Sequence, residues 1–315
     1  MAQRVVLITG CSSGIGQTMA VKLAKDAAKK YLVIPTMRNL EKRKPLEEAA
    51  GSTLNDTMYI EKCDVQCEKS VQDAVDNVVN KFGRIDVLIN NAGIASFQPM
   101  EYMPIEDMKE LFDTNFFGMA RMLQAVLPHM KEQKTGHIIS TSSVSGIGGY
   151  PLYDAYSASK FAIEGITEAL ACRLKAHNIR VCTIVPGPVE TNINTNIVDG
   201  NRIPDKSTVD PITKRQLKNI LTHQKFHFAP PVIQSAEEVA DITAELLDKN
   251  DVDIPPKIFT SDYSLGISQI KNSDLDGMNW VEYIRYLVDK PQHETPDDHK
   301  TWEKNFTYAN QSRRY

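Results

Sequence analysis

Short runs of β-branched residues alternate with longer amphipathic runs over the first 190 residues of this chain. The first run, RVVLIT at residues 4–9, is apolar on both faces, as a strand in the middle of a parallel sheet must be. Strands that alternate with helices of this length form right-handed βαβ units. The alternation therefore predicts an α/β fold, a Rossmann-type doubly wound parallel sheet in a single domain.

The periodicity of the sequence places the elements of this fold. The expected strands cover residues 4–9, 31–35, 58–61, 85–90, 137–141, 180–185 and 257–260. The expected helices cover residues 14–28, 70–82, 108–130, 153–176, 211–222 and 236–247. We also expect a polar helical run before the third strand and a short helix after Asn279.

The Rossmann-type domain is expected to span residues 1–290, with a polar tail at residues 291–315. Residues 188–231 interrupt the alternation with a polar stretch that is rich in Asn and Pro. An insertion of that length in a compact domain usually forms a lid or a binding loop. We interpret it as a substrate lid, in which Phe226 and Phe228 serve either as wall residues or as packing.

Composition narrows the class of partner. A formal net charge of −4 and a pI near 6.0 argue against nucleic acid as the main partner of the chain. The 5 cysteines lack C-x-x-C spacing, which indicates free thiols in a reducing compartment. His223 and His227 stand four residues apart without a recognisable third ligand, so no metal site is predicted.

The first residues, MAQRVVLITG, enter a strand pattern at once and show no secretory leader. The sequence also lacks an apolar stretch of the ~18 residues that a membrane-spanning helix needs. We therefore expect a cytoplasmic protein, and peripheral contact with a membrane stays open.

The segment TGCSSGIG, residues 9–16, stands where the first strand must turn into the first helix. Gly10, Gly14 and Gly16 would let the backbone turn tightly and approach a pyrophosphate at the helix N-terminus. The spacing is G-x-x-x-G-x-G rather than the general G-x-G-x-x-G, and three glycines could serve the turn alone. Its place between strand and helix favours dinucleotide binding.

The end of the second strand indicates which dinucleotide is bound. An acid at this position usually binds the ribose 2′-hydroxyl of NAD, but Met37 and Arg38 stand here instead. Residues 22–44 contain eight Lys or Arg against two acids, a field that suits an extra phosphate. A solvated basic helix face is the alternative explanation. We predict NADP(H).

Polar residues that could carry chemistry follow the later strands. Asn115 is polar within an otherwise apolar helix, where it needs buried partners or kinks the helix. Ser143 lies at the carboxyl edge of the sheet, where open α/β folds bind ligands. Tyr156 and Lys160 share a helix face, and a nearby cation lowers the pKa of a phenol, which is ordinarily about 10. A Tyr-x-x-x-Lys pair alone arises by chance in helices, so it indicates a catalytic site only because the other motifs occur in the same sequence.

Together these segments resemble the short-chain dehydrogenase/reductase family. The resemblance rests on TGCSSGIG, NNAG at residues 90–93, Asn115, Ser143, YSASK at residues 156–160 and PGPVET at residues 186–191. It covers about residues 1–192 and the last helix and strand. The segments DAAKKY, TMRNLEKR, FDTNFFG, MLQAVLPHMK and SASKFAIEG place it near the subgroup of photoreceptor-type all-trans-retinol dehydrogenase and estradiol 17β-dehydrogenase type 1.

The resemblance implies four catalytic residues. Tyr156 would be the general acid and base, and Lys160 would bind the nicotinamide ribose and lower the pKa of Tyr156. Ser143 would hold the substrate oxygen, and Asn115 would position a water molecule for proton relay. Thr141 and Ser142 adjoin Ser143, so the serine is assigned by its spacing of thirteen residues from Tyr156.

The resemblance also implies binding residues. Asp64 would meet the adenine and Thr191 the carboxamide of the cofactor. The full set of expected cofactor residues is Thr9, Gly10, Ser12, Ser13, Gly14, Ile15, Gly16, Arg38, Asp64, Val65, Asn91, Ala92, Gly93, Tyr156, Lys160, Pro186, Gly187, Val189 and Thr191. The expected substrate residues are Ser143, Tyr150, Tyr153 and Tyr156.

The expected function is that of an NADP(H)-dependent oxidoreductase. It would interconvert a small lipophilic alcohol with its aldehyde or ketone, either retinol with retinal or a 17β-hydroxysteroid with a 17-ketosteroid. The alternatives are a reductase of small carbonyl compounds and a non-catalytic NADP-binding regulatory module. The helix at residues 108–130 has more apolar residues than one core face needs, so we expect a homodimer.

Overall fold

The computed structural model of the chain describes residues 3–191, 209–227, 233–249 and 254–289. The expected tail at residues 291–315, much of the expected lid, Phe228 and the side chain of Phe226 lie outside the described residues.

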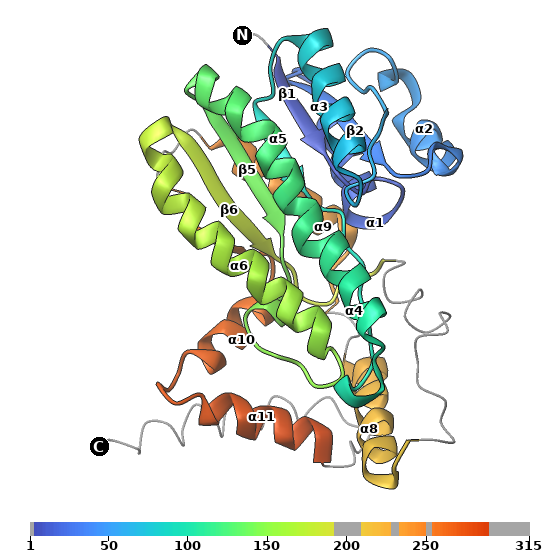
Figure 1. Ribbon diagram of the computed structural model, residues 1–315, viewed down its shortest axis with the longest axis vertical. Helices are drawn as coiled ribbons and strands as arrows, with labels where there is room; N and C mark the ends of the chain where they lie inside the picture. The colour runs from blue at the N-terminus through green and yellow to red at the C-terminus, as the bar shows by residue number, and fades with distance from the viewer. Residues whose placement is uncertain (1–2, 192–208, 228–232, 250–253, 290–315) are drawn as a thin grey trace.

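Seven parallel strands form one sheet in the order β3-β2-β1-β4-β5-β6-β7 (Figure 1). The strands are β1 (Arg4–Ile8), β2 (Tyr31–Met37), β3 (Glu61–Lys62), β4 (Val87–Asn90), β5 (Gly136–Thr141), β6 (Ile179–Val185) and β7 (Lys257–Phe259). The chain builds outward from β1 to β3, then returns to β4 on the other side of β1. This reversal of direction confirms the Rossmann-type doubly wound fold.

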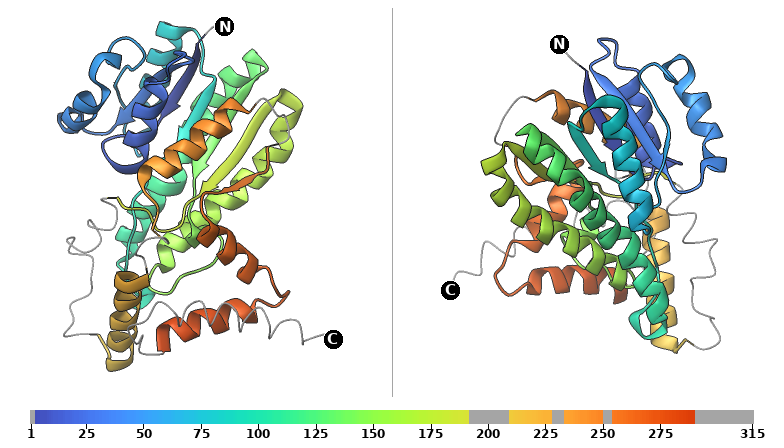
Figure 2. Two further views of the ribbon diagram at one scale, coloured as in Figure 1. Left: turned by 180° about the vertical axis from the view of Figure 1, so that it is seen from behind. Right: turned by 45° about the horizontal axis from the view of Figure 1, so that its top comes forward.

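Helices cover both faces of the sheet and its carboxyl end. They are α1 (Gly14–Ala24), α2 (Lys44–Ala50), α3 (Glu68–Phe82), α4 (Ile105–Phe112), α5 (Gly118–Gln133), α6 (Asp154–Leu174), α8 (Pro211–His227), α9 (Ala236–Asp248), α10 (Asp262–Lys271) and α11 (Met278–Asp289). Figure 1 shows α3, α5 and α6 on the near face, and the view from behind in Figure 2 shows α9 on the opposite face.

The two faces hold separate apolar clusters because successive strand residues point to opposite sides. Val6 and Ile8 of β1 belong to the cluster that α1 and α9 cover. Val5 and Leu7 belong to the cluster that α3, α5 and α6 cover. All four side chains are at most 2% exposed, so β1 is buried on both faces as its sequence predicted.

Two expected elements are clearly different in the structure, and one of them is the third strand, which was expected at residues 58–61 and is Glu61–Lys62. A single helix was expected at residues 108–130, but α4 and α5 are joined by a π-helical turn at Asp113–Phe117. Asn115 lies in this turn and directs its side chain to the backbone of Ile94, outside the helix. A side chain that binds backbone elsewhere holds such a local widening in place, and π-turns of this kind occur frequently at functional sites.

The last helices gather at the carboxyl end of the sheet, where Figure 1 shows α8, α10 and α11 below the strands. Helix α11 had been expected, whereas α10 had not, although Ser261 begins it with a capping box that includes Ser264. Two apolar clusters join these helices to the segments that follow β4 and β5, one around Phe97 and Leu217 and the other around Val144 and Trp280.

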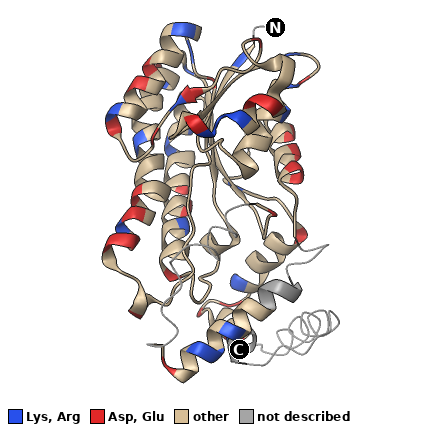
Figure 3. Ribbon diagram, turned by 90° about the vertical axis from the view of Figure 1, so that its right-hand side faces the viewer, with Lys and Arg blue, Asp and Glu red and all other residues tan. Residues whose placement is uncertain are grey.

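The charged residues on the outer helices are of mixed sign, as Figure 3 shows for Lys, Arg, Asp and Glu. This mixture fits the small net charge of the chain, which is −4. Within the described residues, none of the helices combines the length and the apolar character needed to cross a membrane.

Candidate active site

The turn between β1 and α1 is shaped by glycine. Gly10 and Gly14 have φ angles of +73° and +60°, in the left-handed region that favours glycine. A Cβ atom at Gly10 would lie 2.7 Å from Ala92 Cα, and one at Gly16 would lie 2.4 Å from Asn91 Nδ2. The N-cap Ser13 makes no side-chain cap hydrogen bond, so the first amides of α1 face the turn without that partner. The turn therefore offers close backbone approach and helix amides, the features that a pyrophosphate requires.

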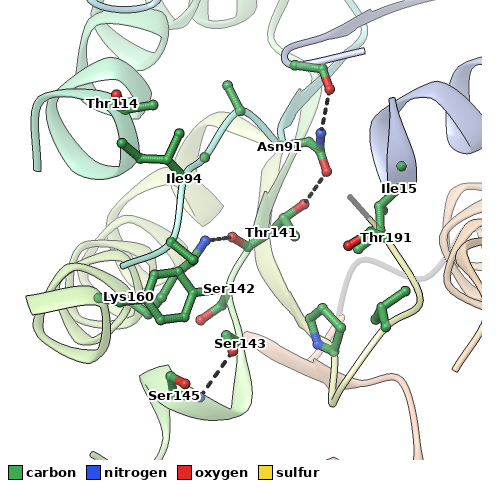
Figure 4. A pocket seen from close by; sticks show the side chains of 18 of the residues that line it. Ile15, Asn91, Ile94, Thr114, Thr141, Ser142, Ser143, Ser145, Lys160 and Thr191 are labelled. Carbon is green, nitrogen blue, oxygen red and sulfur yellow. Dashed lines mark hydrogen bonds between the residues drawn. The ribbon is translucent and has the colours of Figure 1, made fainter. Parts of the chain in front are cut away.

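Thr9 and Asn91 lock this turn to the end of β4. Thr9 Oγ1 accepts hydrogen bonds from the backbone N–H groups of Asn91 and Ala92 at 3.0 and 3.1 Å. Asn91 Nδ2 donates to the backbone oxygens of Thr9 and Gly10 at 3.1 and 3.2 Å. Thr141 Oγ1 then donates to Asn91 Oδ1 at 3.4 Å, which links β5 to the same network (Figure 4).

The end of β2 presents a cation at the mouth of the site. Met37 is buried, whereas Arg38 is exposed and its Nη1 donates to Gln66 Oε1 at 3.4 Å. Gln66 Nε2 donates in turn to Thr114 Oγ1 at 3.1 Å. Asp64 accepts a hydrogen bond from the backbone of Gln66. Gln66 and Thr114 were missed by sequence reasoning, although Gln66 stands only two residues after the expected Asp64.

Tyr156 and Lys160 lie together on α6 and line the same cavity. Lys160 Nζ lies 5.6 Å from the centroid of the Tyr156 ring and donates to the backbone oxygen of Thr141 at 2.9 Å (Figure 4). Ser143, at the end of β5, accepts a hydrogen bond from the backbone N–H of Ser145 at 3.2 Å. Burial raises the pKa of the Tyr156 phenol, and the Ser143 side chain opposes that rise. Thr141, Ser142 and Ser143 all line the cavity beside Tyr156, and the spacing of thirteen residues remains the reason for assigning Ser143.

Burial controls the charge states of this pair. It raises the pKa of Tyr156 to about 12, against the opposite effect of Ser143, and it lowers the pKa of Lys160 to about 8. The sequence had predicted a lowered pKa for Tyr156 because of Lys160. In the structure the ammonium is directed to Thr141 and burial dominates, so the phenol is protonated at neutral pH.

Asn115 supports the site from behind. Its side chain is 1% exposed, and Oδ1 accepts from Ile94 N at 2.8 Å while Nδ2 donates to Ile94 O at 2.9 Å. Nδ2 also donates to Ser159 Oγ at 3.0 Å. Oδ1 would lie 3.3 Å from a Cβ atom built on Gly93. The side chain thus fixes the loop after β4 against α6, and its own polar groups are all engaged.

Aromatic residues form the wall beyond the tyrosine. The Tyr153 ring lies 5.1 Å from the Phe97 ring and 6.0 Å from the Tyr156 ring. Tyr150 is held from behind, since its hydroxyl lies 3.2 Å from that of Tyr263 and its ring meets Trp280 edge-on at 5.4 Å. Sequence reasoning missed Phe97, which follows the NNAG segment by four residues and is 1% exposed.

One cavity of about 820 Å³ brings most of the expected residues together. The expected residues that line it are Gly10, Ser12, Ser13, Gly14, Ile15, Arg38, Asp64, Val65, Asn91, Ala92, Gly93, Ser143, Tyr150, Tyr153, Tyr156, Lys160, Pro186, Gly187, Val189 and Thr191. Thr9, Gly16 and Asn115 do not line the cavity and instead hold the residues that do. The cavity therefore joins the glycine turn to the tyrosine and the lysine.

Comparison with known proteins agrees with this geometry. The family model for short chain dehydrogenase matches residues 4–202. Retinol dehydrogenase 8 of Bos taurus is 39% identical over 246 residues, which cover 78% of each chain. The 17-beta-hydroxysteroid dehydrogenase type 1 of Homo sapiens is 36% identical over 284 residues, 89% of this chain and 84% of that protein.

Solved structures share the fold. A short-chain dehydrogenase from Streptomyces avermitilis superposes with a TM-score of 0.71 at 24% identity, over 98% of both chains. ElxO with NADP bound superposes with a TM-score of 0.68 at 26% identity, over 84% of this chain and 99% of that one. The sequence resemblance and its subgroup are confirmed by the relatives. The chain belongs to the short-chain dehydrogenase family, as an oxidoreductase related to retinol and 17-beta-hydroxysteroid dehydrogenases.

Proposed function

We propose that this chain is an NADP(H)-dependent oxidoreductase that interconverts a lipophilic alcohol with its aldehyde or ketone. The observation that carries the proposal is the cavity that the half-buried Tyr156 and the buried Lys160 line together with a glycine turn suited to a dinucleotide. The relatives named above favour retinal or a 17-ketosteroid as the carbonyl substrate.

The residues at the cofactor end fit NADP(H). Gly10 and Gly16 leave no room for a Cβ atom, and the amides at the start of α1 suit the pyrophosphate. The exposed guanidinium of Arg38 supports binding of a 2′-phosphate, since a guanidinium offers paired donors and a permanent charge. Asp64 and Val65 would lie at the adenine, and Thr191 at the carboxamide. When bound, the cofactor supplies or accepts a hydride.

The residues at the chemical end handle the proton. Ser143 would hold the carbonyl oxygen of the substrate, and Tyr156 would transfer its proton to that oxygen as the alcohol forms. In the opposite direction the same phenol oxygen receives the proton. Because the pKa of Tyr156 is raised to about 12, the free protein holds the acid form that carbonyl reduction needs.

The substrate end favours an apolar molecule. Ile94, Phe97, Tyr153 and Leu221 line the cavity together with Ile233. Apolar walls with a few polar groups at one end are typical of sites that orient a lipophilic ligand by one oxygen. An aldehyde or ketone with a large apolar skeleton fits a cavity that has apolar walls and polar groups at one end.

A substrate panel tests the proposal. Purified protein is mixed with NADPH and all-trans-retinal, estrone or a short aldehyde, and consumption of NADPH is followed together with formation of the alcohol. Turnover of retinal or estrone well above that of the short aldehyde is expected. Preference for the short aldehyde would favour the small-carbonyl alternative, whereas cofactor binding without turnover of any compound would favour the regulatory module.

The homodimer is also a proposal. Ile105 and Phe117 are 60% and 50% exposed, and both border a shallow groove with Met108 and Phe112 on α4 and the π-turn. Apolar side chains that gather on a surface favour association with another chain. Light scattering at micromolar concentration should give twice the mass of one chain, and a monomeric mass would exclude the dimer. The cytoplasmic location and contact with a membrane stay predictions.

A further inference from the structure

A carboxylate that sequence reasoning did not consider lies one helical turn beyond Lys160. Glu164 follows Lys160 by four residues on α6, just as Lys160 follows Tyr156. Residues at this spacing share a helix face, so the three side chains form one row along α6. Glu164 is only 5% exposed, which is unusual for a carboxylate and requires partners.

The anchors of Lys160 and Glu164 are neighbours in the sheet. Lys160 Nζ donates to the backbone oxygen of Thr141 on β5, and Thr183 on β6 donates from Oγ1 to Glu164 Oε2 at 3.3 Å. Thr183 pairs in register with Ser140, the residue directly before Thr141. The ammonium and the carboxylate are therefore held at adjacent positions under the same helix face.

The ion pair with Lys257 does not by itself account for a buried carboxylate at this position. Lys257 Nζ lies 3.8 Å from Glu164 Oε2, a long separation. The same ammonium makes a much closer contact with Glu168, whose side chain is 54% exposed. Lys257 thus already has a solvated partner, and the carboxylate of Glu164 remains as the buried negative charge nearest to Lys160 along the helix.

We propose that Glu164 is a positioning residue that keeps Lys160 protonated in the active site, and that it acts on the reaction only through Lys160. The inference rests on the proposed function, in which the charge of Lys160 serves the tyrosine and the ribose. It adds a third member to the row of Tyr156 and Lys160.

Burial is the main cause that lowers the pKa of Lys160, and the charge of Glu164 raises it. Lys160, by contrast, is not among the groups that shift the pKa of Glu164. Burial is also the main cause that raises the pKa of Glu164, while Ser142, Lys257 and Thr183 lower it and Glu168 raises it. The titratable groups around the pair are Tyr156 toward the cavity, and Lys257 and Glu168 toward the outer edge of the sheet.

Two variants on α6 distinguish the effect of the Glu164 charge on Lys160 from the effect of removing any acidic side chain on this helix. Glu164→Gln removes the charge and retains an oxygen that can accept from Thr183. Glu168→Gln removes a charge one turn further along, from a solvated position that also contacts Lys257. Because the pKa of Lys160 is lowered to about 8, kcat/KM for carbonyl reduction by the wild type should fall as the pH rises through about 8. Glu164→Gln should move this fall down by about one pH unit, whereas Glu168→Gln should leave it in place.

A second readout needs neither cofactor nor turnover. The free energy of unfolding in urea is measured from pH 7 to pH 10 for the wild type, Glu164→Gln and Glu168→Gln, each with and without Lys160→Met. The rise in stability with pH that depends on Lys160 should begin about one pH unit lower in Glu164→Gln. Glu164→Met should give the same shift and serves if Glu164→Gln does not fold.

The outcomes are distinguishable. Equal shifts in Glu164→Gln and Glu168→Gln, or no shift in either readout for Glu164→Gln, would overturn the assignment. A wild-type protein that reduces no carbonyl compound would overturn the proposed function. In that case a stability shift specific to Glu164→Gln would still support the coupling between Glu164 and Lys160.

Discussion

The side chain of Asn115 makes a pair of hydrogen bonds with the backbone of Ile94, accepting from its N–H at 2.8 Å and donating to its oxygen at 2.9 Å. This pair holds the loop after β4 in place and coincides with the π-helical turn at Asp113–Phe117. A buried side chain thus determines the path of the segment that borders the cavity.

Replacement of Asn115 by Ala should destabilise the protein and also lower turnover. The loss removes the partners of the part-buried N–H and C=O of Ile94, which costs about 1–3 kcal/mol of unfolding free energy. Urea unfolding and kcat measure the two effects. Asn77→Ala is the control, since Asn77 contacts Glu61 on the surface, and it should change both quantities little.

Two glycines should respond in opposite ways to alanine. Gly16→Ala should weaken cofactor binding and cost about 1–3 kcal/mol of stability, because its Cβ atom would lie 2.6 Å from the backbone oxygen of Gly10. Gly165 lies in α6 with nothing within 4 Å of an added Cβ atom, so Gly165→Ala should stabilise by about 0.5–1 kcal/mol. Thermal unfolding and NADPH titration measure the stability and the cofactor affinity of the two variants. A Gly16→Ala variant with wild-type stability and affinity would contradict the close packing at Gly16.

Conversion of Arg38 to Asp should shift cofactor preference from NADPH toward NADH. The carboxylate would repel a 2′-phosphate and would accept a hydrogen bond from a ribose 2′-hydroxyl. A change of roughly 10–100-fold in the ratio of the two kcat/KM values is expected. Arg43→Ala is the matched control, since Arg43 pairs with Glu47. An unchanged ratio in Arg38→Asp would refute the assignment of this residue to the phosphate.

Tyr156→Phe should abolish carbonyl reduction and preserve cofactor binding. Removal of a general acid typically costs about 10²–10⁴-fold in rate, while the ring that fills the cavity wall remains. Single-turnover rates and the dissociation constant of NADPH distinguish the two effects. Tyr153→Phe keeps the neighbouring ring and should retain most of the activity. Equal losses of reduction rate in Tyr156→Phe and Tyr153→Phe would contradict the assignment of Tyr156 as the general acid.

Lys160→Met should make the folded protein more stable at neutral pH and catalytically inactive. The pKa of Lys160 is about 8 in the folded state, below its ordinary value of 10.5, so the unfolded chain binds the proton more tightly. Stability of the wild type should therefore rise with pH between about 8 and 10.5. Methionine removes the cost of burying the ammonium, a net gain on the order of 2 kcal/mol after the hydrogen bond to Thr141 is lost. It also removes the rise in stability with pH. A variant less stable than wild type at pH 7 would contradict the burial of a charge here.

Much of the fold follows from local pattern. The two-faced apolar run at β1 and the placement of Gly10 and Gly14 specify a strand, a tight turn and a helix without reference to the rest of the chain. Tyr156 and Lys160 could be placed on one face because helical spacing is fixed by geometry. Ser143 was assigned among its neighbours by spacing alone, and it lines the same cavity as Tyr156, as do Thr141 and Ser142.

The features that the sequence did not predict depend on contacts between residues that are distant in sequence. The π-turn at Asn115 requires Ile94, 21 residues away, as a partner. The raised pKa of Tyr156 comes mainly from the desolvation of its phenol in the folded protein, which cannot be read from the local spacing of residues. The support of Tyr150 by Tyr263 spans 113 residues. Glu164 did carry a local signal, its position four residues after Lys160, but its burial gives that position meaning only in the folded protein.

The wall behind Tyr150 comes from the last third of the chain, where Trp280 Nε1 donates to the backbone oxygen of Gly149 and its ring packs on Gly148. Tyr156 and Lys160 come from α6 and the hydrogen-bond partner of Lys160 comes from β5, both earlier in the chain. Descendants of such a gene could therefore exchange the final helices and acquire new ligands while the proton-handling residues stay untouched. The final helices, which support the cavity wall, are thus separate in sequence from α6 and β5, which hold the residues that transfer the proton.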